Sequence, residues 1–345
     1  GLYYLDQEVD GRGVARVFAR ALVPTAPPIY VTATYDAAVE TTQLAAFAHG
    51  NFKLSEQWSL TGGIRFTDED KDLSYRSTDQ SGLFTNGQAV DSRSETNWAP
   101  KISLNWTPGE DLLVYASYGE AFKSGGWNTD FITSLAALPF EEEQAKAVEL
   151  GLKSTFAANS VQVNAAVFQS KHDDFQVQSF TQLSNGGTAL TVTNAAEVTT
   201  QGFEADVQWI ATDWLRLWGA YGYTDAEFDD FRNCAAGGLD CTGNRPVGAP
   251  KNSWNLGVQL TYPMFGGEFF VQSDYASRDE FYSNPDNRPV NLNESLSLLN
   301  GRVGWNSAAG KWSVTAWGRN LTDEATQTWN TRSFLGIPRA SYTDP

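Results

Sequence analysis

Apolar and polar side chains alternate along much of the chain with a period of two residues. From Trp58 to Phe66 every second residue is apolar or glycine, and the residues between them are small or polar. The same alternation occurs in many further segments, among them 101–106, 148–153, 203–209 and 254–262. Because a strand points successive side chains to opposite faces of its sheet, each segment predicts a strand with one apolar and one polar face.

The connections between these segments fall into two classes that alternate along the chain. We expect about 13 strands, near residues 1–10, 41–54, 58–76, 94–106, 112–122, 143–156, 161–172, 193–210, 214–225, 250–262, 268–276, 294–306 and 312–322. Short connections are expected at 55–57, 107–110, 157–160, 211–213, 263–267 and 306–310, and long polar ones at 77–93, 123–142, 173–192, 226–249, 277–293 and from 323 onward. Membrane barrels keep short turns on the periplasmic side and long loops on the extracellular side. The order therefore predicts an all-β, antiparallel, up-and-down transmembrane β-barrel.

Hydropathy and composition narrow the class further. No segment approaches the roughly 18 uninterrupted apolar residues of a membrane-spanning helix, which excludes a helical transporter. Aromatic residues form 13% of the chain, with 12 Trp, 13 Tyr and 20 Phe, as expected for interfacial girdles, although soluble all-β proteins can share this composition. The formal net charge of −17 argues against a nucleic-acid partner, because such partners require Lys and Arg.

The predicted strand number suggests a fragment. Single-chain bacterial barrels close with an even number of strands, whereas about 13 are predicted here. The first residues, Gly1 to Asp6, lack the basic region and apolar core of an export signal. The last residues, 341–345, stand where a returning strand is expected to begin. We therefore expect an upstream part and at least one further strand to be missing.

Local motifs carry a family resemblance. Residues 113–128 resemble the strand of TonB-dependent outer-membrane receptors that ends in Gly-Phe-Lys-x-Gly-Gly-Phe-Asn, with Ala121 and Trp127 replacing the commoner Gly and Phe. Residues 149–153 match the Glu-x-Gly-x-Lys core of the family's next strand. Further segments in family order are the Asn-Ala…Gly-Phe-Glu segment 194–204, the Arg-Asn-Leu-Thr-Asp segment 319–323 and the approach to the final strand at 338–342.

The resemblance implies a fold and a function. It implies a barrel of 22 strands with a plugged lumen, of which residues 1–345 would form a C-terminal part that lacks the plug domain, the TonB box, the early strands and the final strand. The implied function is import of a scarce nutrient, preferably a ferric siderophore, across the outer membrane of a Gram-negative bacterium. The implied partners are the TonB complex of the inner membrane, the nutrient ligand, and outer-membrane lipid and lipopolysaccharide, with no cofactor.

Other functions remain open at this point. Oligosaccharide, haem and cobalamin receptors would share the barrel and differ in their loops. A passive porin-type channel would share the strand pattern but not the ordered motifs. A soluble polysaccharide-binding or hydrolytic β-protein is a third possibility.

Motifs for catalysis and metal binding are absent from the sequence. It contains no Gly-x-Ser-x-Gly elbow, no phosphate-binding Gly-x-x-x-x-Gly-Lys loop and no Gly-x-Gly-x-x-Gly fingerprint. His49 and His172 are far apart, and neither has Cys or His at ligand spacing. We therefore expect neither an enzyme nor a metal site, although the members of a Ser-His-Asp triad can be distant in sequence.

The two cysteines and the acidic runs have structural interpretations. Cys234 and Cys241 lie in one Gly- and Asn-rich loop, so we expect a disulfide in an oxidising compartment, with a metal site as the alternative. Acidic runs at 141–143, 173–174 and 225–230 are expected to be solvated, with divalent cations bridging to lipopolysaccharide phosphates as the alternative.

Candidate ligand contacts are aromatic, basic and amide residues of the long loops, because these loops and the lumen face meet the substrate. Arg216, between Trp214 and Trp218 on the polar face of its strand, is expected to point into the lumen. Ordinary loop packing or anchoring at the membrane interface is the alternative for each candidate. The loop candidates are Trp127, Asn128, Phe180, Arg245, Phe281, Tyr282, Arg288 and Trp329.

Overall fold

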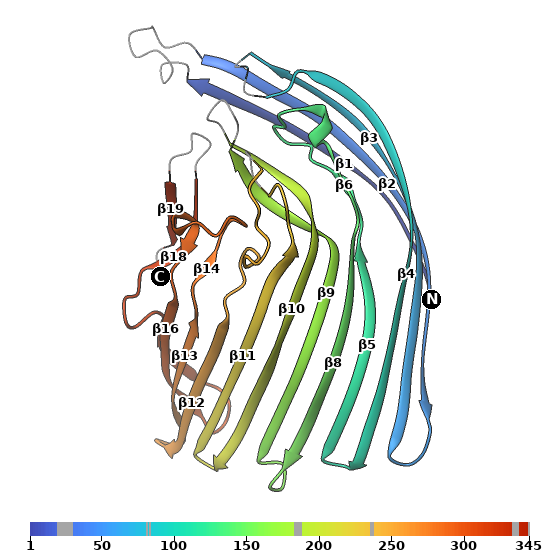
Figure 1. The fold of residues 1–345 in the computed structure, drawn as a ribbon. Coiled ribbons are helices and arrows are strands. Elements are labelled where there is room, and N and C mark those ends of the chain that lie inside the picture. Colours follow the sequence, from blue (N-terminus) through green and yellow to red (C-terminus); the bar gives the residue numbers. More distant parts are fainter. Residues whose placement is uncertain are drawn as a thin grey trace.

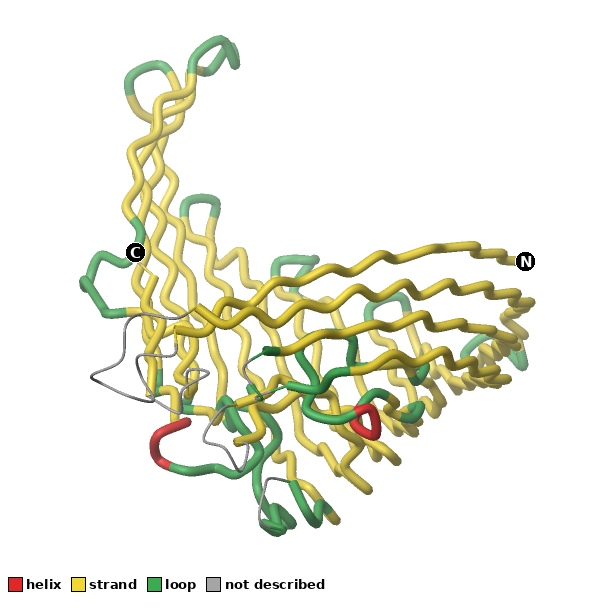
Figure 2. The backbone as a smooth tube through the Cα atoms, turned by 90° about the horizontal axis from the view of Figure 1, so that it is seen from above, coloured by secondary structure: helices red, strands yellow, loops and turns green. Residues whose placement is uncertain are grey.

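The computed structural model is dominated by one antiparallel sheet of 13 strands, which curves like the wall of an open barrel (Figures 1 and 2). The structure describes residues 1–18, 30–80, 82, 84–182, 188–234, 238–332 and 338–343. Each strand pairs with the next in the order β1-β2-β3-β4-β5-β8-β9-β10-β11-β12-β13-β16-β17. The up-and-down antiparallel prediction, with its strand number, is confirmed.

The sheet strands differ more than twofold in length, and short strands and 3₁₀ helices lie in the loops between them. The strands are β1 (Leu2–Phe18), β2 (Tyr30–Lys53), β3 (Trp58–Asp79), β4 (Gly87–Gly109), β5 (Leu112–Lys123), β8 (Glu143–Phe156), β9 (Val161–Gln182), β10 (Thr188–Thr212), β11 (Leu215–Asp230), β12 (Asn252–Met264), β13 (Gly267–Arg278), β16 (Leu296–Ser307) and β17 (Ser313–Gly318). The loop elements are β6 (Gly126–Trp127), β7 (Pro139–Phe140), β14 (Phe281–Tyr282), β15 (Leu292–Asn293), β18 (Thr326–Arg332), β19 (Pro338–Thr343) and the 3₁₀ helices η2 (Leu135–Ala137) and η3 (Pro289–Asn291).

Short turns gather at one end of the sheet and the longer loops at the other (Figure 1). The turn between β12 and β13, for example, needs only Phe265 and Gly266, both with positive φ (54° and 69°). Glycine takes this conformation without strain, which suits it to such a tight reversal. No helix of the described part of the chain is long and apolar enough to cross a membrane.

An exposed apolar surface, here called the outer belt, covers one face of the sheet. It consists of the outward side chains of β3 from Trp58 to Phe66 and of their cross-strand neighbours. Ile64, Leu150 and Leu256 are typical members, with 47%, 53% and 54% of their surfaces exposed. Cross-strand pairing keeps the belt continuous, because Leu150 lies opposite Val167, which lies opposite Phe203 on β10. A contiguous apolar surface on one face of such a sheet matches the outward apolar band of a transmembrane β-barrel.

Aromatic pairs bound the outer belt on β3 and β4. Trp58 stacks on Trp106 near the short turns, with 6.0 Å between ring centroids. Phe66 packs on Trp98 at the other edge, with a separation of 4.8 Å. Trp58 and Phe66 are eight positions apart, about 26 Å along a strand and about 20 Å across the membrane at a tilt of about 40°. This height is close to the apolar band of about 25 Å in outer-membrane barrels.

Several strands continue well past the belt, which corrects the predicted loops. The expected loop 77–93 shrinks to 80–86, because β3 runs to Asp79 and β4 begins at Gly87. The expected loop 173–192 is mostly strand, because β9 ends at Gln182 and β10 begins at Thr188. Residues 77–79 of β3 are all polar, and only Phe175, Val177 and Phe180 are apolar in the extension of β9, so the hydrophobic periodicity is weak there.

The C-terminal part differs from the prediction in another way. The last sheet strand, β17, spans Ser313–Gly318 rather than 312–322. Residues 338–343, predicted to approach a returning strand, instead form β19 and pair with β18 in a separate two-stranded sheet. A left-handed residue, Asn320 (φ 48°), follows β17.

Candidate ligand-binding site

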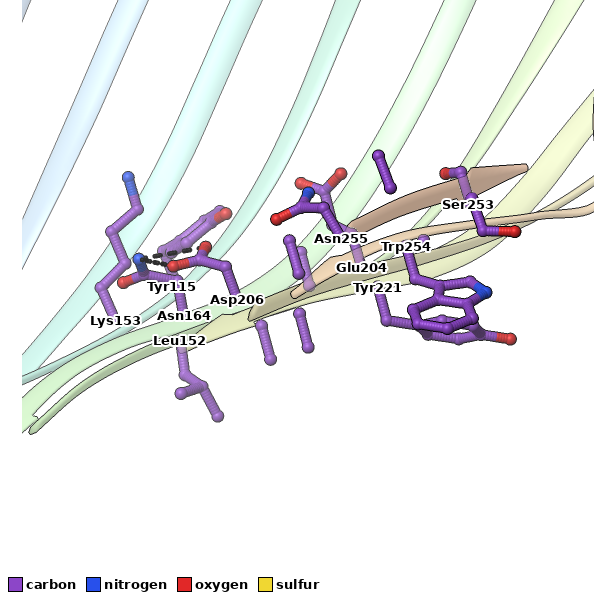
Figure 3. Close-up of a pocket in the computed structure, with 17 residues that line it drawn as sticks. Tyr115, Leu152, Lys153, Asn164, Glu204, Asp206, Tyr221, Ser253, Trp254 and Asn255 are labelled. Atoms are coloured by element: carbon purple, nitrogen blue, oxygen red, sulfur yellow. Dashed lines mark hydrogen bonds between the residues drawn. The ribbon is translucent and has the colours of Figure 1, made fainter. Parts of the chain in front are cut away.

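The face opposite the outer belt, here called the inner wall, carries polar side chains (Figure 3). Lys153, Tyr115 and Asp206 rise from this face, while Leu152 and Trp254 point the opposite way toward the belt. The polar residues are linked to one another. Tyr115 donates to Glu149 Oε1 at 2.6 Å, and Asn164 donates to Asp206 Oδ2 at 3.0 Å. Tyr115, Asn164 and Asp206 line a hollow of about 620 Å³.

Arg216 lies on the same wall, beside a second hollow of about 480 Å³. It pairs in register with Gln259 of β12, and Asp206 and Gln272 also line the hollow. The neighbouring Trp218 lies over Gly257, where a β-carbon would come within 1.9 Å of the indole. The structure thus places Arg216 and Trp218 on the inner wall, the face expected from the strand alternation.

Two loops at the mouth of the barrel, residues 231–251 and 279–295, are joined to each other. We call them the mouth loops. The side-chain amide of Asn287 accepts from Arg245 N and donates to Arg245 O, each at 2.9 Å, in the manner of a β-bridge. Asn244 donates to Pro285 O, and Gly248 N donates to Tyr282 O, also at 2.9 Å. The mouth loops therefore form one unit.

One arginine of the mouth loops and one at the end of β13 stack on successive aromatic rings. The Arg245 guanidinium lies 5.2 Å from the ring centroid of Tyr282, and that of Arg278 lies 4.6 Å from the ring centroid of Phe281. Arg245 also forms an ion pair of 3.4 Å with Glu280. No ion pair to Arg278 occurs among the described residues. The mouth thus presents a cation that lacks a carboxylate partner and lies beside an aromatic face.

A disulfide closes a short ring within the first mouth loop and packs this loop against the strands below it. Cys234 is bonded to Cys241, and both are buried. They pack in an apolar cluster with Phe228, Phe231 and Val177, which belong to β11, the loop itself and β9. The cluster anchors this mouth loop to the wall through apolar burial, which is worth roughly 1.5–3 kcal/mol for each large side chain.

The loop between β5 and β8, residues 124–142, is folded against the inner wall. We call it the notch loop. Trp127 is 8% exposed, packs with Leu73 and Tyr75, and donates its indole N–H to Asp91 Oδ2 at 2.9 Å. Asn128 donates to Val192 O at 2.9 Å and accepts from Val192 N at 2.7 Å. The structure therefore places Trp127 and Asn128 in contacts within the protein.

The tip of the notch loop contacts the extensions of β2 and β3. Tyr35 donates to Asp130 Oδ1 at 2.6 Å, and this hydrogen bond, together with burial, raises the pKa of Tyr35 to about 12. Tyr75 donates to Asp130 O at 3.4 Å. The notch loop therefore reaches from the ends of β5 and β8 back to β2.

The remaining candidates fall in different places. Arg288 lies at the exposed edge of the second mouth loop, 3.4 Å from Asp286. Phe180 and Trp329 belong to β9 and β18, and their side chains lie outside the described residues. Of the candidates, the structure brings together Arg245, Phe281 and Tyr282 at the mouth.

Sequence reasoning missed three residues of this cluster, namely Arg278, Glu280 and Asn287. Arg278 and Phe281 are three positions apart, a spacing that could have suggested a stacked pair. Nothing local to the sequence indicates that Asn287 pairs with a backbone 42 residues earlier.

One arrangement on β8 and β9 has the geometry of a Ser-His-acid relay. Ser170 Oγ is 3.0 Å from His172 Nε2, and His172 Nδ1 is 2.9 Å from Glu143 Oε1. The other oxygen of Glu143 accepts the backbone N–H of Gln176 at 2.9 Å, so this carboxylate also attaches β9 to the start of β8. In the described part of the chain, no group of three or more His, Cys, Asp or Glu could hold a metal ion.

A sheet with an apolar outer belt and a polar inner wall has the arrangement of a transmembrane β-barrel. Comparison with family models gives the particular family. The TonB-dependent receptor-like β-barrel model matches residues 7–321, and the chain belongs to this family. The family and its structural neighbours are transport receptors rather than enzymes.

Two relatives illustrate the similarity in sequence. The metal-pseudopaline receptor CntO of Pseudomonas aeruginosa is 26% identical over 220 residues, which are 63% of this chain and 28% of the relative. The probable TonB-dependent siderophore receptor PiuA of Acinetobacter baumannii is 23% identical over 236 residues, or 64% of this chain and 29% of the relative. The matched region thus covers less than a third of these relatives.

Solved structures show the same fold. The ferric yersiniabactin uptake receptor FyuA from Yersinia pestis matches with a TM-score of 0.77 and 17% identity, covering 99% of this chain and 49% of that one. The siderophore receptor PiuA from Acinetobacter baumannii matches with a TM-score of 0.74 and 19% identity, covering 99% and 50%. The chain spans about half the length of these receptors.

Proposed function

We propose that this chain is the barrel part of a receptor in the outer membrane of a Gram-negative bacterium, and that the receptor imports a ferric siderophore with energy from TonB. The observation that carries the siderophore proposal is the mouth cluster, where Arg278 stacks on Phe281 with no acidic partner among the described residues and Arg245 stacks on Tyr282. The names of the relatives CntO and PiuA, a metal-pseudopaline receptor and a probable siderophore receptor, support it.

The mouth cluster suits an anionic, unsaturated metal chelate. A guanidinium held over a ring contributes about 0.5–2 kcal/mol by cation–π attraction, and its N–H donors point outward along the edge of the guanidinium plane. A chelate that carries negative charge gains charge-assisted hydrogen bonds from those donors. Aromatic groups of such a chelate could stack beside Phe281 and Tyr282, which supply apolar surface.

Import in this proposal proceeds without covalent chemistry. The ligand binds at the mouth loops and then meets the inner wall around Arg216, Lys153 and Asp206, which carries both signs of charge and many amides. Such a wall binds a ligand weakly at several positions, and weak binding at each position lets the ligand pass to the next one. The uphill step needs an external energy source, which we assign to TonB acting on a part of the receptor outside residues 1–345.

The membrane setting follows from the two faces. We place the outer belt in lipid, and the strand extensions beyond Phe66 in the layer of lipopolysaccharide headgroups. Oligosaccharide or cobalamin import, and passive diffusion through a porin-type channel, are the alternative functions. An uncharged sugar would need a flat ring to stack on and hydrogen-bond partners for its hydroxyl groups. The mouth cluster instead offers two guanidinium cations, Arg245 and Arg278.

Growth of a strain that lacks the whole receptor gene tests this proposal. Under iron limitation, with the strain's own secreted siderophores as the iron source, the deletion strain should grow poorly and recover on complementation. Normal growth in iron limitation, together with failure on one glycan or on cobalamin-dependent medium, would instead support one of the alternatives.

A further inference from the structure

The extracellular edge of the wall has a notch above β5 and β8. These strands end at Lys123 and begin at Glu143, whereas the flanking β4 and β9 continue much further from the membrane. Figure 1 shows β4 and β9 rising past the ends of β5 and β8, with the green loop elements between them. Without a filling element, the mouth would be open sideways at this position.

The notch loop fills this gap and is bonded to the β3–β4 side by its backbone. Lys71 Nζ donates to Gly125 O at 2.9 Å, and Arg93 donates to Phe140 O at 2.7 Å. Gly125 N donates to Glu95 at 3.2 Å. A β-carbon on Gly125 would lie 2.2 Å from Arg93 Nη2 and 2.7 Å from Phe140 O, which explains the glycine at this position.

Three amide side chains bond the notch loop to the β9–β10 side. Asn128 pairs with both backbone groups of Val192. Asn194 pairs in the same way with Glu141, accepting from its N–H at 2.8 Å and donating to its carbonyl at 3.0 Å. Gln176 donates to Ser124 O at 2.9 Å and to Glu141 O at 3.0 Å.

These amides replace a missing strand. Because β11 ends at Asp230, opposite Glu197, the residues of β10 before Glu197 have no neighbouring strand on that edge of the sheet, and the backbone groups of Val192 must find other partners. An amide that both donates and accepts supplies the pairing that a strand residue would give. Asn128 also donates to Ala137 O at 3.0 Å, so it fixes the loop internally as well.

We propose that Asn128 is a positioning residue for import: with Val192 it fastens the notch loop as a fixed side wall of the mouth, which prevents bound ligand from escaping sideways. Asn194 acts with it on the same edge of β10. The role in uptake rests on the proposed function, whereas the fastening itself does not. Ligand-dependent movement at the mouth is then confined to the joined mouth loops, and the notch loop stays in place.

Loss of the hydrogen bonds between Asn128 and Val192 should weaken the apparent affinity for the ligand more than it lowers the maximal rate of uptake. If the closed wall is populated only part of the time, the apparent dissociation constant rises by the inverse of that fraction. The ligand-bound state itself is unchanged, so the rate at saturation should persist. Removing the Asn128 bonds should raise the half-saturating ligand concentration roughly five-fold, as expected for the net loss of a buried hydrogen-bonded pair.

A nitroxide at residue 134 of the full-length receptor tests the fastening. Ser134 is exposed, and its side chain makes no capping hydrogen bond, so Ser134→Cys gives a neutral labelling site. The label should be immobile in the otherwise wild-type receptor and become mobile with Asn128→Ala or, separately, Asn194→Ala. The matched control is Asn287→Ala, which removes the same kind of amide pair between the mouth loops and should leave the label immobile.

Uptake of ⁵⁵Fe-labelled siderophores from iron-starved culture medium tests the function of the fastening. We expect Asn128→Ala to raise the half-saturating concentration and keep the maximal rate within about two-fold. A label that is mobile already in the wild type, or that Asn128→Ala leaves immobile, would overturn the proposal, as would a mobilised label with unchanged half-saturation. Absence of ⁵⁵Fe uptake by the wild-type receptor would count against siderophore import alone, because the label test does not depend on it.

Discussion

The indole of Trp127 donates its N–H to Asp91 Oδ2 at 2.9 Å while its ring is buried against Leu73 and Tyr75. This contact turns a residue of a family motif, expected as a ligand contact, into the apolar anchor of the notch loop. Lys123-Ser124-Gly125-Gly126-Trp127-Asn128 thus has a structural account: two glycines for close passage, an indole for burial and an amide for pairing.

Trp127→Ala should loosen the notch loop. Removing a buried Trp side chain costs about 3–5 kcal/mol. Here the cost lowers the free energy that is needed to open the notch loop locally. Hydrogen exchange of amides in residues 124–142 should accelerate strongly. The control is Trp312→Ala, because Trp312 lies in a short turn and its side chain is 72% exposed. In this variant, amide exchange in residues 124–142 should match that of the wild type. Equal exchange in both variants would contradict the burial argument.

Gly125→Ala should have a similar local effect through crowding. The new β-carbon would meet Arg93 and a backbone oxygen of Phe140 well inside contact distance, and overpacking of this kind costs typically about 1–3 kcal/mol. Gly62→Ala on β3 is the matched control, because a β-carbon on Gly62 would have no other atom within 4 Å. Limited proteolysis of the folded receptor should cleave the notch loop of the Gly125 variant faster than that of the Gly62 variant.

Acid should loosen the notch loop through Glu69, which lies on β3 beyond the belt. Burial alone would raise the pKa of Glu69, but contacts with Lys71, Ser124 and Gln43 outweigh burial and lower it below 4.5. Lys71 Nζ is 2.7 Å from Glu69 Oε1, a close ionic contact outside hydrogen-bond geometry, and the same Nζ donates to Gly125 O.

A carboxylate whose pKa is lowered in the folded state stabilises the fold at pH values above its unfolded-state pKa. This stabilisation is lost as the pH falls from the unfolded-state pKa through the folded-state pKa. The label at residue 134 should therefore gain mobility as the pH falls through 4.5 and below. Glu69→Gln should remove most of that pH dependence, whereas Glu56→Gln, at an exposed position of a short turn, should retain it. A wild-type label that is insensitive to acid would show that Glu69 does not support the loop.

Arg278→Gln should weaken siderophore binding. The substitution removes the cation beside Phe281, and charge-assisted hydrogen bonds are worth about 1.5–3 kcal/mol, so the dissociation constant should rise at least about ten-fold. Arg278→Lys should recover part of the affinity because it restores the charge. The control variant is Arg302→Gln. In the wild type, the guanidinium of Arg302 donates a hydrogen bond to Gln272 on the inner wall. Equal affinity of the Arg278→Gln and wild-type receptors would remove this residue from the site.

The sequence predicted best the parts of the fold that meet lipid. Alternation from Trp58 to Phe66 identifies a strand because one face must be apolar where it contacts hydrocarbon. Beyond Phe66 the pattern still predicts a strand as far as residue 76, where Asp68, Asp70 and Asp72 point outward and Leu73 and Tyr75 lie on the other face. The last residues of β3, 77–79, are all polar, so the alternation ends there and the pattern predicts a loop for these residues.

The candidate site was predictable only where local composition carried the signal. Arg245, Phe281 and Tyr282 were found because basic and aromatic residues in long loops are uncommon and accessible. Asn128 and Asn287 each pair with a backbone more than 40 residues away, a relationship that depends on the register of the whole sheet. Trp127 looked accessible because loop membership does not reveal that a loop folds inward.

The most direct test of the account is energised iron uptake by the whole receptor. ⁵⁵Fe-siderophore uptake should be measured in wild-type cells, in cells lacking the receptor gene and in complemented cells, each with and without a proton uncoupler. We predict saturable uptake that disappears in the deletion strain, returns on complementation and stops with the uncoupler. Uptake that persists in the deletion strain, or that continues unchanged with the uncoupler, would contradict import of a ferric siderophore by a TonB-driven receptor.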